Sequence, residues 1–178
     1  MDALRKEDFY TTDDIYALPD GERAELIDGK IYYMAPPSTV HQRLVHFFDR
    51  EIGNYIQSKH GECEVFPAPF AVFLNENDKT YVEPDISVVC DKDKITDKGC
   101  QGAPDWIIEI VSPGSRQMDY YTKLFKYRTA GVREYWVVDP DRKSVTVYGF
   151  EQDNMEEYAF GVEVPVGIYE GLTIHVSL

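Results

Sequence analysis

The pattern of hydrophobic and polar positions predicts a β-hairpin near the start of the chain. Two strand-like runs, 24–27 and 30–34, flank the dipeptide Asp28-Gly29, which between such runs is the strongest short signal for a hairpin turn. Ahead of them, Thr12 precedes two aspartates and an isoleucine, an arrangement typical of a helix N-cap with acidic residues in the first turn. The chain should therefore begin with a short helix, followed by the hairpin.

Beyond the hairpin, the spacing alternates between helical and strand-like. Apolar residues recur at helical spacing through 40–60, which predicts the longest helix, and again through 117–130, where Gly131 should end the helix. Residues 91–102 are polar and predict a loop. Strand-like runs are expected at 64–66, 70–74, 85–89, 106–111, 134–139 and 144–148, with edge strands in the remainder through 173–176. This interleaving indicates an α/β (α+β) fold, a central mixed β-sheet flanked by helices with an N-terminal β-hairpin.

The run 106–111 differs from the other strands because it is almost continuously apolar. Such runs are typical of a central strand that is covered on both faces. Glu109 is the acidic residue that interrupts it. A carboxylate in a buried strand is costly unless it is paired, protonated or bound to a metal, so Glu109 is the first candidate for chemistry.

Length and composition favour one packed globular domain over 1–178. The chain has 178 residues, 43% of them hydrophobic and 13% aromatic, which suffices for one core. Charged side chains are spread through its first ten residues and its apolar runs are short, so neither an export signal nor a membrane span is expected. Cys63, Cys90 and Cys100 are odd in number and lack Cys-x-x-Cys spacing, which argues against a disulfide framework and a structural zinc site. Reduced thiols in the cytoplasm are the expectation.

The charge distribution bears on whether the chain can bind nucleic acid. A net charge of −14 argues against a generic nucleic-acid binder, because neutralising phosphates requires basic residues. Residues 1–30 carry nine acids against four bases, and residues 151–178 carry six acids against none, so these ends hold −5 and −6 of that charge. Between Arg116 and Arg133 there are five bases and one acid. This segment is either a basic patch, with Arg116 and Lys126 as candidate substrate contacts, or an ordinary solvated helix face.

Asp85 can join Glu109 in a metal site. It opens another strand directly after Pro84, and carboxylates at adjacent strand ends can meet across about 4.8 Å. Mg²⁺ is commonly held by one or two carboxylates, with waters and substrate phosphate completing an octahedron of oxygens. The backbone carbonyl of Ile110 could add one ligand. The alternative is a buried ion pair without a metal, satisfied by backbone amides or by a lysine.

A lysine near such carboxylates would help to position an attacking water and offset charge in the transition state. The residue two positions after the strand glutamate is Val111, so a Glu-x-Lys arrangement is absent. The second long helix offers Asp119, Lys123 and Tyr127 at i, i+4 and i+8, on one face. We expect Lys123 to serve the site, with Lys126 as the alternative, and Tyr127 to be a core aromatic residue.

Four ordered motifs resemble the Uma-type restriction endonuclease family of the PD-(D/E)XK superfamily. They are, in chain order, Pro84-Asp85, Glu109-Ile110-Val111-Ser112-Pro113, Asp119-x-x-x-Lys123-x-x-x-Tyr127 and Gly131-Val132-Arg133-Glu134-Tyr135-Trp136-Val137-Val138-Asp139-Pro140. The resemblance extends upstream to Glu25-Leu26-Ile27-Asp28-Gly29 and to His41. It implies a PD-(D/E)XK fold in which Asp85 and Glu109 bind the metal, and in which the lysine has moved from the strand to the helix as Lys123.

The resemblance also singles out two residues that the pattern alone would leave as ordinary polar groups. Glu25 is otherwise a solvated strand acid, and His41 is otherwise a histidine near a helix start. Both become candidates for the active site. Val111 departs from the lysine that is usual in the superfamily.

The function that the resemblance implies is a DNA endonuclease dependent on Mg²⁺ or Mn²⁺ that leaves 5′-phosphate ends. A two-fold homodimer is expected, because two sites can then face the two strands of a duplex. The alternative from another class is a binding or interaction protein that keeps the nuclease fold without turnover, which Val111 and the acidic ends favour. Cleavage of RNA or of single strands is the alternative on the substrate side.

Overall fold

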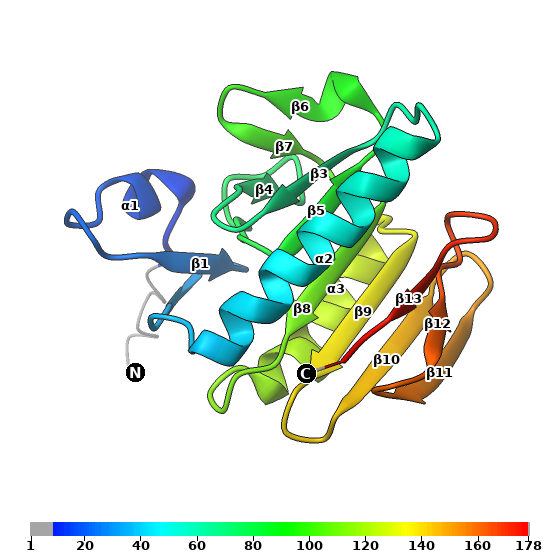
Figure 1. Ribbon diagram of the computed structural model, residues 1–178. Helices are drawn as coiled ribbons and strands as arrows, with labels where there is room; N and C mark the ends of the chain where they lie inside the picture. Colours follow the sequence, from blue (N-terminus) through cyan, green and yellow to red (C-terminus); the bar gives the residue numbers. More distant parts are fainter. Residues whose placement is uncertain (1–8, 178) are drawn as a thin grey trace, which may run out of the picture.

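A six-stranded mixed sheet forms the centre of the computed structural model, which describes residues 9–177 (Figure 1). The strands lie in the order β11-β10-β9-β8-β5-β3. Their bounds are β3 Glu64–Pro67, β5 Ile86–Val89, β8 Trp106–Ile110, β9 Glu134–Asp139, β10 Ser144–Gly149 and β11 Asn154–Ala159. β8 and β9 pair in parallel and the other neighbours are antiparallel. The predicted central mixed sheet flanked by helices is confirmed.

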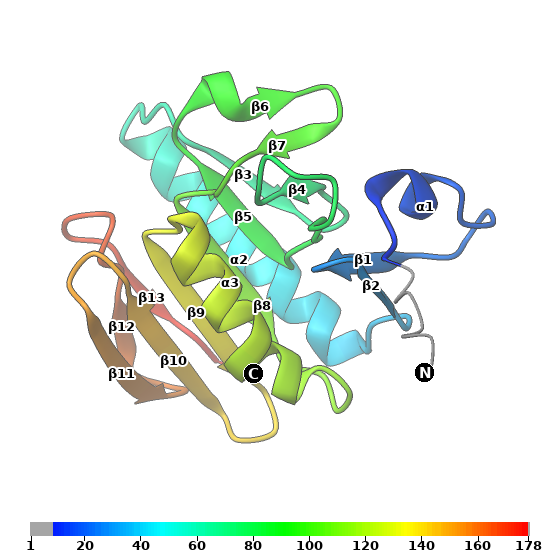
Figure 2. The same cartoon turned by 180° about the vertical axis from the view of Figure 1, so that it is seen from behind.

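Helices cover both faces of this sheet. α2 (Thr39–Ser58) crosses one face, and the other carries a π-helical segment, η2 (Met118–Lys123), that runs on into α3 (Leu124–Ala130) (Figures 1 and 2). All five residues of β8 are buried, as its apolar sequence predicts. None of the helices formed by residues 9–177 has both the length and the apolar character needed to cross a bilayer.

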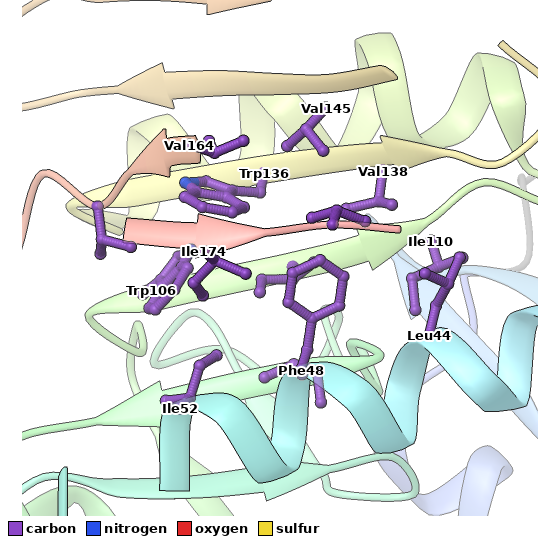
Figure 3. Packing of buried hydrophobic residues seen from close by; sticks show 14 of the residues in the cluster. Leu44, Phe48, Ile52, Trp106, Ile110, Trp136, Val138, Val145, Val164 and Ile174 are labelled. Atoms are coloured by element: carbon purple, nitrogen blue, oxygen red, sulfur yellow. The ribbon is translucent and has the colours of Figure 1, made fainter. Parts of the chain in front are cut away.

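The two hydrophobic clusters on either side of the sheet follow the alternation of its strands. Trp106 and Trp136 point toward α2, where Phe48 meets the Trp136 ring edge-on at 6.3 Å between centroids (Figure 3). Neighbouring strand residues point the other way, so Ile107 packs with Tyr127 under α3. By the same alternation, Glu109 faces the side of η2 and α3. The alternation of the strand therefore places the Glu109 carboxylate on the face of the sheet that the helical layer of Lys123 covers.

The predicted hairpin is present as β1 (Ala24–Ile27) and β2 (Lys30–Tyr33). Its turn residues Asp28 and Gly29 have φ of 51° and 75°, the left-handed values that a two-residue turn of this kind needs and that an aspartate followed by glycine accepts readily. Before it lies the short helix α1 (Thr12–Tyr16), whose N-cap is Thr11 rather than the predicted Thr12. The start lies one residue earlier because the Thr11 N–H donates to Asp14 Oδ2 at 2.7 Å.

The prediction of a strand at 70–74 and a loop at 91–102 was wrong in detail. β4 covers only Val72–Phe73 and pairs with β7 (Gly99–Gln101). β7 in turn pairs with β6 (Ile95–Thr96), which follows a 3₁₀ turn at Lys92–Lys94, so that the polar segment builds a small separate sheet. Gly99 permits this pairing because a Cβ there would lie 2.2 Å from the Ala71 carbonyl oxygen. No local sequence pattern predicts the close approach of Gly99 to Ala71.

The C-terminal strands also differ from expectation. β12 (Glu163–Pro165) and β13 (Thr173–His175) form their own antiparallel pair instead of extending the sheet, whose edge is β11. Val164 and Ile174 are buried in the cluster on the α2 side (Figure 3). This hairpin therefore completes the cover of the sheet beside α2.

The expectation of reduced thiols fails for two of the three cysteines. Cys63 and Cys90 form a disulfide. The cause lies in the register of β3 and β5, which pairs Glu64 with Val89, so the residues one step beyond that pair face each other across the strands. Only strand pairing between distant segments brings these cysteines together, and sequence spacing carries no sign of it. Cys100 is free and buried, and burial raises the pKa of its thiol to about 11.

Candidate active site

Asp85 and Glu109 meet because β5 and β8 are neighbouring antiparallel strands. The register pairs Ile86 with Ile108, and one step further along each strand places Asp85 across from Glu109. Asp85 Oδ2 accepts a hydrogen bond of 2.7 Å from the backbone N–H of Ile110. The two carboxylates therefore occupy adjacent strand ends, as the sequence predicts.

Glu109 is held by two donors from the helical layer. Its side chain is buried, and Oε1 accepts hydrogen bonds from Lys123 Nζ at 2.9 Å and from the Tyr127 hydroxyl at 2.6 Å. Val111 lies on the same face of the strand and packs in the apolar cluster under α3. The helix thus brings Lys123 to the carboxylate from the side on which a lysine at position 111 would project.

Lys123 also joins the N-terminal hairpin to the site. Its ammonium lies 2.9 Å from Glu25 Oε2, and both side chains are buried. Glu25 Oε1 in turn accepts the backbone N–H of Glu83 at 3.0 Å. Glu25 is consequently no solvated strand acid; it shares the lysine with Glu109.

Asp119 is a further buried carboxylate of the cluster, and it was not among the residues expected to act there. It is the second residue of the π-helical segment η2, and its Oδ2 accepts the Ser115 hydroxyl at 2.6 Å. The Tyr135 hydroxyl donates to its backbone carbonyl at 3.0 Å. The spacing of Asp119, Lys123 and Tyr127 carried the signal for this residue, since all three face the sheet.

His41 lies in the first turn of α2, where Ser38 Oγ accepts its backbone N–H at 3.2 Å. Its ring Nε2 is 3.1 Å from Asp85 Oδ2. Burial would lower the pKa of His41, but the hydrogen bond and charge of Asp85 outweigh it and raise the pKa above the usual value. The long helix thereby brings a proton-bearing group to the carboxylate at the start of β5.

Negative charge exceeds positive charge in this cluster. Glu25, Glu109 and Asp119 interact with the one ammonium of Lys123, and Asp85 adds a fourth carboxylate that interacts with Glu109. Burial raises the pKa of Glu109 well above its usual value despite the lysine, and raises that of Asp119 to about 6. Burial alone would lower the pKa of Lys123, but its acidic neighbours raise it well above the usual value. Additional positive charge would be stabilised here.

The other two candidate residues lie away from the carboxylates. Arg116 pairs with the buried Asp139, to which its Nη2 donates at 3.3 Å, and also approaches Asp141. Lys126 Nζ donates a hydrogen bond of 2.6 Å to Oδ1 of Asp28, which lies at the hairpin turn. The ammonium beside Glu109 is therefore that of Lys123 and not that of Lys126.

The donor set fits a divalent cation of the magnesium type. Among residues 9–177, no group of three or more His, Cys, Asp or Glu side chains is arranged to hold a metal ion. A magnesium site needs fewer side-chain ligands than three, because carbonyl oxygens, waters and phosphate complete the shell around one or two carboxylates. Asp85, Glu109 and the Ile110 carbonyl would supply the protein ligands of such a shell. The excess of carboxylates over cationic groups gives the electrostatic reason for a cation to bind.

A mixed central sheet flanked by helices is the architecture of the restriction-endonuclease-like fold, and two carboxylates lie here at adjacent strand ends with a lysine beside them. The model of the Uma2 family, described as putative restriction endonuclease, matches residues 8–177, and the chain belongs to that family. It is similar over 93% of its length to a crystal structure of a "putative nuclease belonging to DUF820" from Anabaena variabilis, with 25% identity, 94% of that chain covered and a TM-score of 0.75. No curated protein matches the chain.

Proposed function

We propose that the chain is a DNA endonuclease that requires Mg²⁺ or Mn²⁺ and leaves 5′-phosphate ends. The observation that supports this function best is the shared ammonium of Lys123, within 3 Å of both Glu109 and Glu25. It restores, from a helix, the combination of carboxylates and lysine that phosphodiester hydrolysis uses.

In this proposal Asp85, Glu109 and the Ile110 carbonyl hold the cation. When bound, the cation supplies Lewis acidity to the phosphate and a more acidic water. The ammonium of Lys123, which Glu25 and Glu109 hold in place, would orient or activate the attacking water. Its position is fixed before substrate arrives, so little reorganisation is needed during the reaction.

Glu25 and His41 act on the site through other residues. Glu25 pairs with the Lys123 ammonium as a second carboxylate partner beside Glu109 and so helps to fix its position. His41 hydrogen-bonds Asp85 Oδ2, the oxygen that also accepts the Ile110 N–H. With Oδ2 of Asp85 held in this way, Oδ1 would be the oxygen that binds the cation.

DNA would approach along the segment that carries Arg116 and Lys126. Both cations pair with acidic residues, Asp139 and Asp28, but the Arg116 side chain keeps 34% of its surface exposed and can reach a phosphate. Cutting both strands calls for two sites, which a two-fold homodimer would supply.

Supercoiled plasmid with Mg²⁺ or Mn²⁺ at low salt tests this function. Wild-type protein should nick the plasmid only with metal, whereas Asp85→Asn and Lys123→Met proteins of unchanged circular dichroism should lose at least about a hundredfold in rate. Arg128→Ala is the matched control, because Arg128 lies on α3 and pairs with the exposed Asp153. Absence of nicking by wild type, or equal loss in the control, would refute the proposal.

A nuclease-fold binding protein without turnover is the second candidate. It is favoured by the two donors already on Glu109 Oε1, which make the cluster a closed ion-pair network. Calorimetric titration with Mn²⁺ separates the two candidates. The nuclease should bind the ion and lose binding in Asp85→Asn, whereas the closed network should give no heat of binding in either protein.

A further inference from the structure

Tyr32 lies across the hairpin from the active-site residue Glu25. The register of β1 and β2 pairs these two residues directly, and side chains of a directly paired couple project from the same face of a ribbon, with Cβ atoms about 5 Å apart. Glu25 reaches Lys123 from that face. The Tyr32 side chain therefore begins next to the buried cluster.

The two members of the pair differ sharply in exposure. Glu25 is 5% exposed, whereas Tyr32 is 37% exposed. The aromatic ring thus lies where the face that bears Glu25 opens to solvent, at the rim of the cluster. In both views the hairpin lies beside the first turns of α2, which carry His41 (Figures 1 and 2).

Lys30 adds an exposed cation to the same face. It precedes Tyr32 by two residues, so the alternation of the strand directs both side chains the same way. Among the residues that the structure describes, Lys30 forms no salt bridge. An exposed ring beside an exposed ammonium matches a nucleotide, whose base stacks and whose phosphate is anionic.

We propose that Tyr32 stacks on an unpaired base of the DNA strand that is cut, and that Lys30 contacts its phosphate backbone. This inference rests on the nuclease function proposed above and names the form of its substrate. Bases within a duplex are already stacked on their neighbours and offer no free face. The strand at the site is therefore unpaired, as in single-stranded DNA, a frayed or branched end, or a locally unwound stretch of a supercoiled plasmid.

Tyr33 provides a matched control within the same strand. It pairs with Ala24, projects from the opposite face of the hairpin and is 67% exposed. Loss of either ring removes a solvent-accessible aromatic side chain from β2, but only Tyr32 shares the face of Glu25. A general effect on hairpin stability or surface hydrophobicity should appear in both variants.

Fluorescence anisotropy with a labelled single-stranded oligonucleotide in EDTA tests the stacking without cleavage. Tyr32→Ala should raise the Kd about tenfold or more, Tyr32→Trp should bind like wild type, and Tyr33→Ala should bind like wild type. An oligonucleotide of the same length built from abasic sites should bind wild type and Tyr32→Ala equally. A fully paired duplex should be insensitive to Tyr32→Ala.

Each contrary result overturns the inference. It is wrong if wild type does not bind the single strand, if Tyr32→Ala binds like wild type, or if Tyr33→Ala loses as much. Equal loss on the abasic probe would also contradict stacking. Plasmid nicking reports separately on the nuclease. If Tyr32→Ala weakens binding of the single strand but wild type shows no metal-dependent nicking, the proposed function alone is wrong. If wild type nicks the plasmid but Tyr32→Ala binds the single strand as tightly as wild type does, this inference alone is wrong.

Discussion

At the scale of single residues, the buried network shows how an acidic side chain becomes acceptable inside a sheet. Glu109 is almost wholly buried, and one of its oxygens is satisfied by an ammonium and a phenol. A buried carboxylate that loses such a donor retains the cost of removal from water. The stability of the fold therefore depends on these hydrogen bonds to Glu109.

Tyr127→Phe tests this dependence. The substitution removes the hydroxyl that donates to Glu109 and leaves the ring, so it should lower the free energy of unfolding by about 1–3 kcal/mol, as measured in urea, and slow nicking. Tyr148→Phe is the control, because Tyr148 packs in the same cluster and, among the described residues, its hydroxyl has no hydrogen bond to a side chain. Equal losses in the two variants would show that the hydroxyl contributes nothing specific.

The ion pair of Asp139 and Arg116 should make stability depend on pH. Burial pushes the pKa of Asp139 upward, but hydrogen bonds from Arg116 and from backbone N–H groups outweigh it and hold the pKa below its usual value. The stabilisation is then present above the unfolded-state pKa, about 3.9, and is lost as pH falls through the lower folded-state value.

Asp139→Asn should consequently lower the free energy of unfolding at neutral pH by about 1.5–3 kcal/mol, with the difference shrinking in strong acid. Denaturation followed by tryptophan fluorescence across this range measures it. Asp141→Asn is the control, since Asp141 is 72% exposed and lies 3.6 Å from the same guanidinium. A pH-independent difference for Asp139→Asn would contradict the ionic explanation.

At the scale of elements, the sequence predicted best what local patterns determine. The hairpin turn, the long helix and the buried strand with Glu109 each carry their signal within a few residues. The short sheet around Gly99 and the Cys63–Cys90 pair depend on contacts between segments that are distant in the sequence. Asp119 was not among the expected site residues because its burial beside Lys123 depends on how η2 packs on the sheet, although its spacing from Lys123 placed both on one helix face.

Glycine-to-alanine substitutions should have opposite effects on stability in α2, which local spacing predicts, and in the short sheet around Gly99, which depends on a distant contact. Gly53→Ala, within α2, should stabilise the protein by about 0.5–1 kcal/mol, because a Cβ there meets the Val65 side chain at an ordinary 3.5 Å and helix entropy improves. Gly99→Ala should destabilise it by at least about 2 kcal/mol, because its φ is 130° and the Cβ would overlap Ala71. Thermal melts compare both with wild type, and shifts of the same sign would contradict this account.

At the scale of the whole molecule, the disulfide links the sheet edge to the strand that carries Asp85. Cys63 and Cys90 close a segment with a sequence separation of 27. Cross-linking such a segment restricts the unfolded chain and should stabilise the fold by about 3–4 kcal/mol. A reductant should therefore lower the melting temperature of wild type and leave a Cys63→Ser, Cys90→Ser double variant unchanged. A reductant effect of equal size in the double variant would trace it to another cause.

The contact between Lys123 and Glu25 spans 98 residues of sequence. During synthesis the ribosome releases the hairpin long before the helix that carries the lysine, so Glu25 waits without its partner while most of the chain is still being made. The ammonium and the strand carboxylates can come together only after β1, β8 and η2 have all left the ribosome. The cluster of Glu25, Glu109 and Lys123 therefore assembles late in synthesis, after the segments at both ends of this 98-residue span have been made.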